Sequence, residues 1–95
     1  MSERTITVTV KAFGGIRDLV GSPLRFELSA RSKVSDLLNA AYERVPGLRE
    51  RLEDGLARGY LTILLDGRNV RFLRGMETAL PDGATVAFLP PIGGG

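Results

Sequence analysis

The side chains that carry most enzyme chemistry are missing from this sequence of 95 residues, which contains no cysteine and no histidine. A thiol nucleophile, a disulfide framework and a zinc knuckle are therefore excluded. The commonest general base and the commonest metal ligands are excluded as well. Carboxylates, lysines, hydroxyls and two tyrosines remain. We therefore expect a protein that binds no metal and is not a self-sufficient enzyme.

One stretch stands out for its composition, FLPPIGGG at residues 88–95, which contains two prolines and three glycines. The paired prolines have no amide hydrogen, so the chain must leave any central strand there. Glycine lacks a Cβ, which lets a backbone thread a narrow channel. We expect an arm made of Pro90, Pro91, Ile92, Gly93, Gly94 and Gly95. On chemistry alone, a disordered terminus or a glycine-rich linker is an equal alternative.

The elements that must position this arm are predicted from the periodicity of the apolar residues. Alternation with period two predicts strands over residues 5–13, 24–29, 60–65, 68–73 and 84–89. Apolar residues with helical spacing follow Ser32, a candidate N-cap, and stop at Pro46-Gly47, so one amphipathic helix is expected there. A loop is predicted over residues 14–23, and a short helical turn over 48–56.

Turn signals connect the later strands. Asp66-Gly67 and Pro81-Asp82-Gly83 each separate two apolar runs, and glycine there accepts a positive φ at no steric cost. The resulting order is strand, strand, helix, strand, strand, strand. This order predicts an α+β fold whose helix covers one sheet face, with a single domain over residues 1–89 and a tail over residues 90–95.

The open face of the predicted sheet carries a candidate partner surface. If Ile63 and Leu65 point toward the helix, period two turns Leu64 outward. The same rule places Val86 and Phe88 inward. The candidate apolar patch on the open face then consists of Leu64, Ala87 and Leu89. Scattered exposed apolar residues are normal, so chance exposure is the competing interpretation.

Charge adds one further candidate surface. The net charge of +2 comes from both signs scattered along the chain, a pattern that argues against a nucleic-acid interface. Arg68, Arg71 and Arg74 are spaced three apart. They are interpreted either as a solvated strand edge or as a docking surface for an acidic partner; Arg71 and Arg74 are retained as candidate interface residues.

Hydropathy suggests where the protein works. The longest apolar runs are only a few residues long, too short to span a bilayer. The first residues, MSERTITVTV, lack the apolar core of a signal peptide. We therefore expect a cytoplasmic protein with no membrane partner.

With these residues in hand, the sequence resembles the ubiquitin-like sulfur carriers, the MoaD/ThiS superfamily. The resemblance is carried by FLPPIGGG and the preceding turn PDGATV, by the strand TITVTVKAF, by the GIRDLVG loop and by the helix start KVSDLLNAAYERVPGL. The family includes the small subunit of molybdopterin synthase, the thiamine-pathway carrier and a carrier used in cysteine synthesis. The resemblance implies a β-grasp fold, with a mixed sheet of about five strands and one main helix.

The resemblance also implies a mechanism and partners. An ATP-dependent, ubiquitin-activating-type adenylyltransferase would adenylate the Gly95 carboxylate, and a sulfur donor enzyme would convert it to a thiocarboxylate. The terminal sulfur would pass to an acceptor enzyme such as the molybdopterin synthase large subunit or a cysteine synthase. The chain itself would bind no cofactor, since ATP is used by the activating enzyme. No nucleic-acid partner is expected, because the charges are scattered along the chain.

Alternatives remain at this point. The molybdopterin-type assignment is favoured by the paired prolines, while cysteine synthesis, thiamine synthesis or tRNA thiolation stay open. A ubiquitin-like modifier would instead join Gly95 to lysines through isopeptide bonds. A non-covalent interaction module would not need the last two glycines at all.

Overall fold

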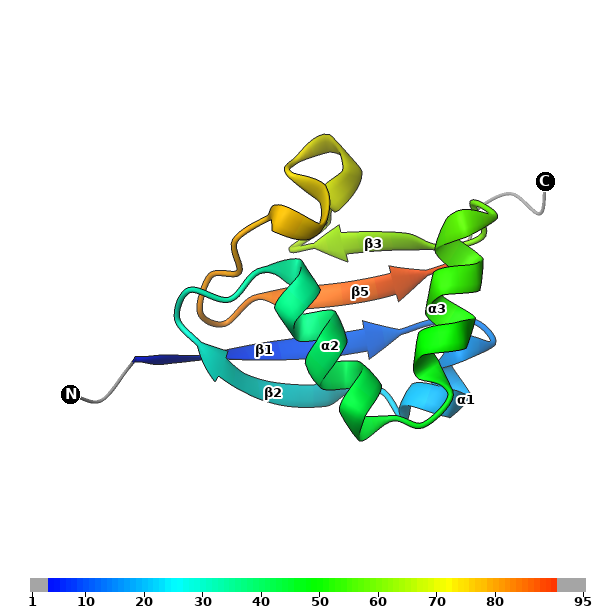
Figure 1. The fold of residues 1–95 in the computed structure, drawn as a ribbon, viewed down its shortest axis with the longest axis horizontal. Coiled ribbons are helices and arrows are strands. Elements are labelled where there is room, and N and C mark those ends of the chain that lie inside the picture. Colours follow the sequence, from blue (N-terminus) through cyan, green and yellow to red (C-terminus); the bar gives the residue numbers. More distant parts are fainter. Residues whose placement is uncertain (1–3, 91–95) are drawn as a thin grey trace.

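The computed structural model describes residues 4–90 of the chain. Its strands and helices follow one another in this order: β1 (Thr5–Ala12), α1 (Ile16–Val20), β2 (Leu24–Ser29), α2 (Val34–Arg44), α3 (Leu48–Ala57), β3 (Thr62–Leu65), β4 (Arg68–Asn69), the 3-10 turns η1 (Val70–Phe72) and η2 (Gly75–Glu77), and β5 (Thr85–Leu89). Figure 1 shows α2 and α3 lying across the strands.

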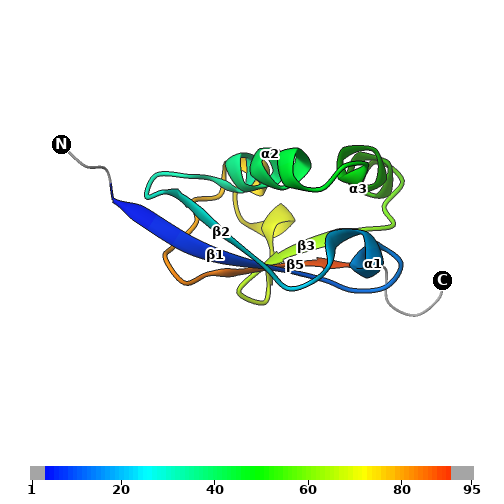
Figure 2. The same cartoon turned by 90° about the horizontal axis from the view of Figure 1, so that it is seen from below.

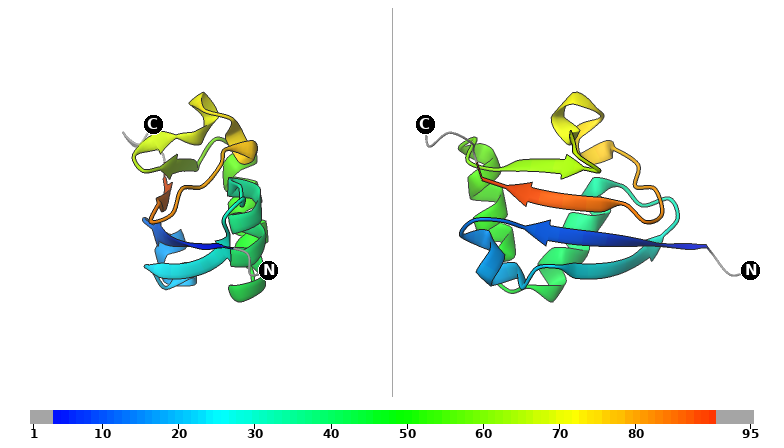
Figure 3. Two further views of the ribbon diagram at one scale, coloured as in Figure 1. Left: turned by 90° about the vertical axis from the view of Figure 1, so that its left-hand side faces the viewer. Right: turned by 180° about the vertical axis from the view of Figure 1, so that it is seen from behind.

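The strands form one mixed sheet in the order β2-β1-β5-β3-β4. The last strand, β5, lies at its centre, parallel to β1 and antiparallel to β3. β1 pairs with β2 in an antiparallel hairpin, as its alternating sequence predicts. α2 and α3 cover one face of the sheet, while the opposite face has no helix over it in the part of the chain that the structure describes (Figures 2 and 3).

The core lies between the sheet and the two longer helices. The side chains of Val8, Val10, Val86 and Phe88 are fully buried on this face of β1 and β5. The helix α2 contributes its predicted apolar positions, and its buried residues are Val34, Leu37, Leu38 and Ala41. The buried apolar side chains of residues 4–90 form one connected cluster, so the sheet and helices are stabilised together.

Two local predictions were wrong, and one helical segment was predicted as too short. The predicted 14–23 loop contains the short helix α1, which ends at Gly21 with a left-handed φ of 69°. The predicted 48–56 turn is part of the ten-residue helix α3. Ser32 is not the N-cap of α2; Lys33 holds that position, and its N–H donates to the Asp36 carboxylate at 2.8 Å.

The predicted strand over residues 68–73 was also wrong beyond its first two residues. Pairing between β3 and β4 includes only Arg68 and Asn69. The Asn69 side chain then accepts a hydrogen bond of 2.9 Å from the N–H of Arg71, and the chain turns into η1. Asparagine competes with ladder hydrogen bonds in this way because its side chain reaches nearby backbone groups.

The two turn predictions are confirmed. Asp66 and Gly67 both adopt positive φ values, 48° and 85°, as a two-residue hairpin turn requires. The Asp66 carboxylate also accepts a 2.8 Å hydrogen bond from the N–H of Thr85. In the second turn, the Asp82 carboxylate accepts a 2.8 Å bond from the N–H of Thr7, so both turns are tied to neighbouring strands.

The buried face of β5 gives a stability prediction. Val86→Asp places an unpaired carboxylate where the side chain is fully buried, and we expect a loss of several kcal/mol in the free energy of unfolding. The matched control is Ala87→Asp, because Ala87 is partly exposed on the other face of the same strand. Urea denaturation measures both, and equal losses would contradict the assignment of the two faces.

Candidate functional site

The predicted arm begins at the end of the central strand. β5 ends at Leu89, and Pro90 follows it as the last described residue. The other predicted arm residues, Pro91, Ile92, Gly93, Gly94 and Gly95, lie outside the described residues. The geometry that can be examined is therefore the root of the arm, where Pro90 leaves the sheet.

This root is fixed by a close approach between Pro90 and Gly14. A Cβ built on Gly14 would lie 3.1 Å from the Cγ of Pro90, and Gly14 has a φ of +71°. Both features favour glycine, because an L side chain is strained in that region and would press on the proline ring. Beside it, the N–H of Phe13 donates to the carbonyl oxygen of Phe88 at 3.1 Å.

A shallow hollow of about 230 Å³ surrounds the root. It is lined by Phe13, Tyr60, Leu61 and Pro90, together with polar side chains from α3. Phe13 is 43% exposed and Tyr60 is 58% exposed. Our sequence reasoning missed both aromatic residues as site candidates. A usable signal was present, because each stands at a junction between a strand and a glycine-containing loop.

The predicted apolar patch on the open face is brought together by strand pairing. Leu64 of β3 lies directly opposite Ala87 of β5, and Leu89 lies opposite Thr62. Each side chain of the patch, Leu64, Ala87 and Leu89, is partly exposed, whereas the alternating residues on the other face are buried. Lys11 of β1 pairs with Ala87 from the other side, so one cation borders the patch.

Arg71 and Arg74 do not join this patch. Arg71 belongs to η1, and Arg74 immediately precedes η2. Both residues are exposed, and they lie beyond the β3 edge of the sheet rather than on its open face. The interface residues predicted from the sequence therefore divide into two separate surfaces.

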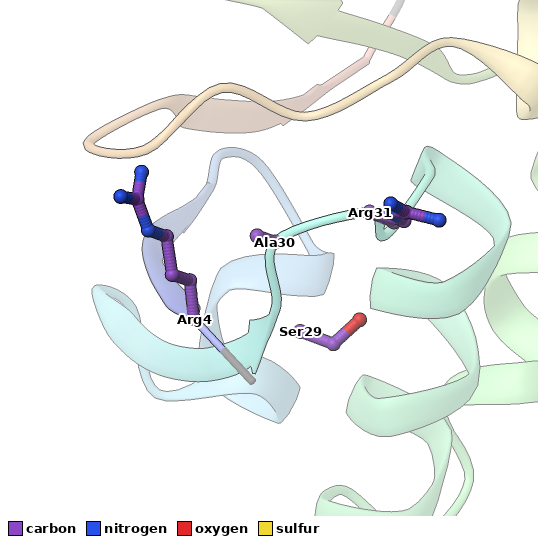
Figure 4. Close-up of a pocket in the computed structure, with 4 residues that line it drawn as sticks. All are labelled: Arg4, Ser29, Ala30 and Arg31. Atoms are coloured by element: carbon purple, nitrogen blue, oxygen red, sulfur yellow. The ribbon is translucent and has the colours of Figure 1, made fainter. Parts of the chain in front are cut away.

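Another hollow lies at the opposite end of β1 from the arm root. It is lined by Arg4, Ser29, Ala30 and Arg31. Figure 4 shows the side chains of Arg4 and Arg31 extending in different directions. Because their charges do not converge, this hollow offers no focused anion site.

Two chemical searches cover residues 4–90 only. Within that range, no group of three or more carboxylate, histidine or cysteine side chains could hold a metal ion. None of the helices in the same range is long and apolar enough to cross a bilayer. The candidate site therefore consists of the arm root and the open-face patch.

Comparison with protein families decides where the sequence belongs. The model of the ThiS family matches residues 10–95, from β1 through the final glycines. The chain belongs to the ThiS family. The prediction of a ubiquitin-like member of the sulfur carrier superfamily is thereby confirmed.

Individual relatives agree with the family model. Small archaeal modifier protein 3 of Haloferax volcanii is 35% identical over 88 residues, which cover 90% of this chain and 96% of that protein. The solution structure of small archaeal modifier protein 1 from Methanosarcina acetivorans matches with a TM-score of 0.74 and 34% identity, covering 97% of this chain and 99% of that one.

A third match is a complex, that of subunits 1 and 2 of the molybdopterin-converting factor from Helicobacter pylori. It has a TM-score of 0.57 and 28% identity, and covers 95% of this chain and 100% of the matched chain. Together with the mixed five-stranded sheet, these matches confirm the predicted β-grasp fold.

The arm root gives a second prediction, with a matched pair of glycines. Gly14→Ala should lower the free energy of unfolding by about 1–2 kcal/mol, because a left-handed conformation costs that much for an L residue. Gly15→Ala should change it by less than about 0.5 kcal/mol, since Gly15 has a φ of −63° and its added Cβ would meet only an Arg51 nitrogen at 3.6 Å. Urea denaturation measures both variants, and equal losses would contradict the geometry of the root.

Proposed function

We propose that this protein is a ubiquitin-like sulfur carrier whose Gly95 carboxylate is adenylated by an ATP-dependent activating enzyme and then converted to a thiocarboxylate. The observation that carries the proposal is the family match, which extends through residue 95 and so includes the final glycines. The cargo would be the terminal sulfur, used by an acceptor enzyme in biosynthesis.

The chemistry needs an activating partner because a carboxylate is a poor electrophile. A carboxylate oxygen of Gly95 would attack the α-phosphorus of ATP and release pyrophosphate. Hydrosulfide, supplied by the sulfur donor, would then attack the acyl carbon, the bond to AMP would break, and the product would be the Gly95 thiocarboxylate and free AMP. The chain contributes the carboxylate and the glycine backbone, while the enzymes contribute all catalytic groups.

A folded domain is useful in this scheme because threading the arm costs entropy. Ordering each residue of a free segment costs about 1–2 kcal/mol, and glycines lose the most freedom. A partner can recover that cost by contacting the folded part near the root. The patch of Leu64, Ala87 and Leu89 is suited to this role, since it is partly exposed, apolar and borders the point where β5 ends.

A second candidate function is protein modification. It is favoured by the names of two relatives, both called small archaeal modifier proteins, at 35% and 34% identity. In this reaction a lysine amine would attack the same activated acyl carbon, and an isopeptide bond would replace the bond to AMP. Carrier and modifier therefore share activation and differ in the nucleophile.

Among acceptors, a molybdopterin-type enzyme remains our first proposal. It is supported by the likeness to the Helicobacter pylori complex, in which two subunits of a molybdopterin-converting factor are assembled. A cysteine synthase, the thiamine pathway and tRNA thiolation are the other acceptors that the sulfur chemistry would suit. Copurification of an acceptor enzyme with the loaded carrier distinguishes them.

The chemistry predicts a change of mass at one position. Incubation with a cognate activating enzyme, ATP and a sulfur source should exchange one oxygen for sulfur at Gly95, as measured by intact and fragment mass spectrometry. Gly94→Val should slow adenylation at least about tenfold, or about 1.4 kcal/mol in the barrier, because a β-branched side chain adds bulk beside the reacting end. Circular dichroism serves as the folding control.

Three outcomes would contradict this prediction. Sulfur found only at internal residues would exclude the Gly95 thiocarboxylate. A wild-type rate of pyrophosphate exchange with the Gly94→Val variant would exclude a narrow channel around this residue in the activating enzyme. Isopeptide-linked adducts of higher mass, formed without any thiocarboxylate, would favour the modifier over the carrier.

The open-face patch gives a fourth prediction. Leu64→Glu should weaken association with the activating or acceptor enzyme at least about tenfold, since it places a charge in the centre of an apolar contact. Asn39→Glu is the matched control, because Asn39 is exposed on α2, across the molecule from the open face. Titration calorimetry measures both affinities, and unchanged binding by the folded Leu64→Glu variant would remove the patch from the interface.

A further inference from the structure

The outer edge of β3 is left without a neighbouring strand over half its length. β4 pairs only with Leu64 and Leu65 of β3. Thr62 and Ile63 therefore have no strand partner on that side among the described residues. The N–H of Asp66 donates to the carbonyl oxygen of Thr85 in β5, so Leu64 and Asp66 direct their backbone groups toward β5. In an antiparallel ladder the alternate residues, Leu61 and Ile63, direct theirs toward the outer edge.

A groove of about 430 Å³ runs along this edge. One wall is the end of α3 and the following turn, and the other wall is formed by η1 and η2, the loop that stands beyond β3 in Figure 1. The residues that line it are Leu56, Gly59, Leu61, Thr62, Ile63, Asn69, Val70, Arg71, Gly75 and Met76. The groove is thus mainly apolar, with one cation.

The walls of the groove are held in place by polar contacts. The Asn69 side chain accepts from the N–H of Arg71 at 2.9 Å, which starts η1. The hydroxyl of Thr78 donates to the carbonyl oxygen of Gly75 at 2.7 Å. The Lys33 ammonium pairs with the Glu77 carboxylate at 2.7 Å and ties η2 to the start of α2; this hydrogen bond raises the pKa of Lys33.

The charges around the groove favour an acidic occupant. Arg71 lines it, and Arg68 and Arg74 are exposed on the adjoining residues. The ion pairs within residues 4–90 are Lys33 with Glu77 and Arg58 with Asp54, so none of the three arginines has a carboxylate partner there. Phe72, between them, is 81% exposed, and adds an apolar surface next to the positive charge.

The opposite edge of the sheet differs, because one backbone carbonyl of β2 is already occupied. The guanidinium of Arg44 donates to the carbonyl oxygen of Arg25 at 2.7 Å. The same group lies 3.9 Å above the centre of the Phe26 ring. A side chain that occupies an edge carbonyl hinders the addition of another strand. The β3 edge is therefore the better acceptor of an extended chain.

We propose that the β3 edge groove binds an extended acidic segment of a partner protein, which adds to the sheet beside Leu61–Ile63. Backbone hydrogen bonds to the outer edge of β3 supply part of the affinity, as in other cases of strand addition. Apolar side chains at alternate positions of the segment enter the groove, and its carboxylates meet Arg71 and the neighbouring arginines. This surface is distinct from the open-face patch, and it shares Leu61 with the hollow at the arm root.

A defined peptide tests the proposal. The probe is a fluorescein-labelled peptide of about nine residues in which Asp or Glu alternates with Val or Ile. Fluorescence anisotropy should show saturable binding that weakens as salt is raised. In heteronuclear NMR spectra the largest shifts should occur at the amides of Leu61, Ile63 and Arg71, while those of Lys11 and Ala87 on the open face stay unchanged.

Variants and peptide controls separate the contributions. Arg71→Glu should weaken binding at least about tenfold, or about 1.4 kcal/mol. Arg17→Glu, which makes the same change of charge on α1, should weaken it less than about twofold. A peptide N-methylated at alternate amides should lose binding, because strand addition needs those donors, and a peptide with lysines in place of the acidic residues should not bind.

Several results would overturn the proposal. Absence of binding by the folded wild-type protein at peptide concentrations of about 1 mM would do so, as would shifts located on the open face or near Arg4 and Arg31. Equal losses of peptide affinity in the Arg71→Glu and Arg17→Glu variants would show that the binding depends on net charge and not on the groove. Full binding of the N-methylated peptide would exclude strand addition. Each of these results leaves the thiocarboxylate test unaffected, so the two proposals fail separately.

Discussion

The pairing of β5 between β1 and β3 is the constraint on which the rest of the structure depends. Its parallel ladder with β1 and antiparallel ladder with β3 hold the last strand on both sides. Val86 and Phe88 are fully buried, and burying a side chain of that size contributes about 1.5–3 kcal/mol. The chain therefore enters its final residues from one of the most firmly held parts of the fold. For a partner that binds the folded domain, the first residue of the arm, Pro90, is therefore held at a fixed position.

The same strand divides the molecule into a core side and a contact side. Period two sends alternate residues of β5 to opposite faces, so the patch residues Ala87 and Leu89 follow from the burial of their neighbours. Gly14 completes the arrangement, because its left-handed backbone leaves room for Pro90 where the strand ends. The position at which Pro90 leaves the sheet is thus a consequence of strand pairing and of one glycine.

Much of this could be predicted from the sequence, for a physical reason. Strands β1 and β5 and helix α2 are half-buried elements, and the spacing of their apolar residues predicts which face is buried. The predictions failed where a local side-chain hydrogen bond or charged neighbours determine the path of the chain. Asn69 diverts the chain by bonding the N–H of Arg71, and no periodicity reports such a bond. The length of helix α3 was underestimated because its buried residues Leu48 and Leu52 stand among charged neighbours.

The site itself could be predicted only in part. The interface candidates Leu64 and Arg71 came from independent sequence patterns. Whether they lie on one surface or on two depends on the turn after β4, which the patterns do not show.

That separation explains how one small sheet can offer two different kinds of contact. A sheet face presents side chains, so recognition there depends on apolar shape and tolerates partners of different backbone structure. A sheet edge presents backbone groups, so recognition there requires an extended segment whose hydrogen bonds are parallel to those already in the sheet. In this protein the face lies beside the root of the arm, whereas the edge groove lies between α3 and η2. In our proposal, an enzyme that acts on Gly95 contacts the face, because Leu89 of that face directly precedes Pro90, and the edge is left for a contact that does not require the arm.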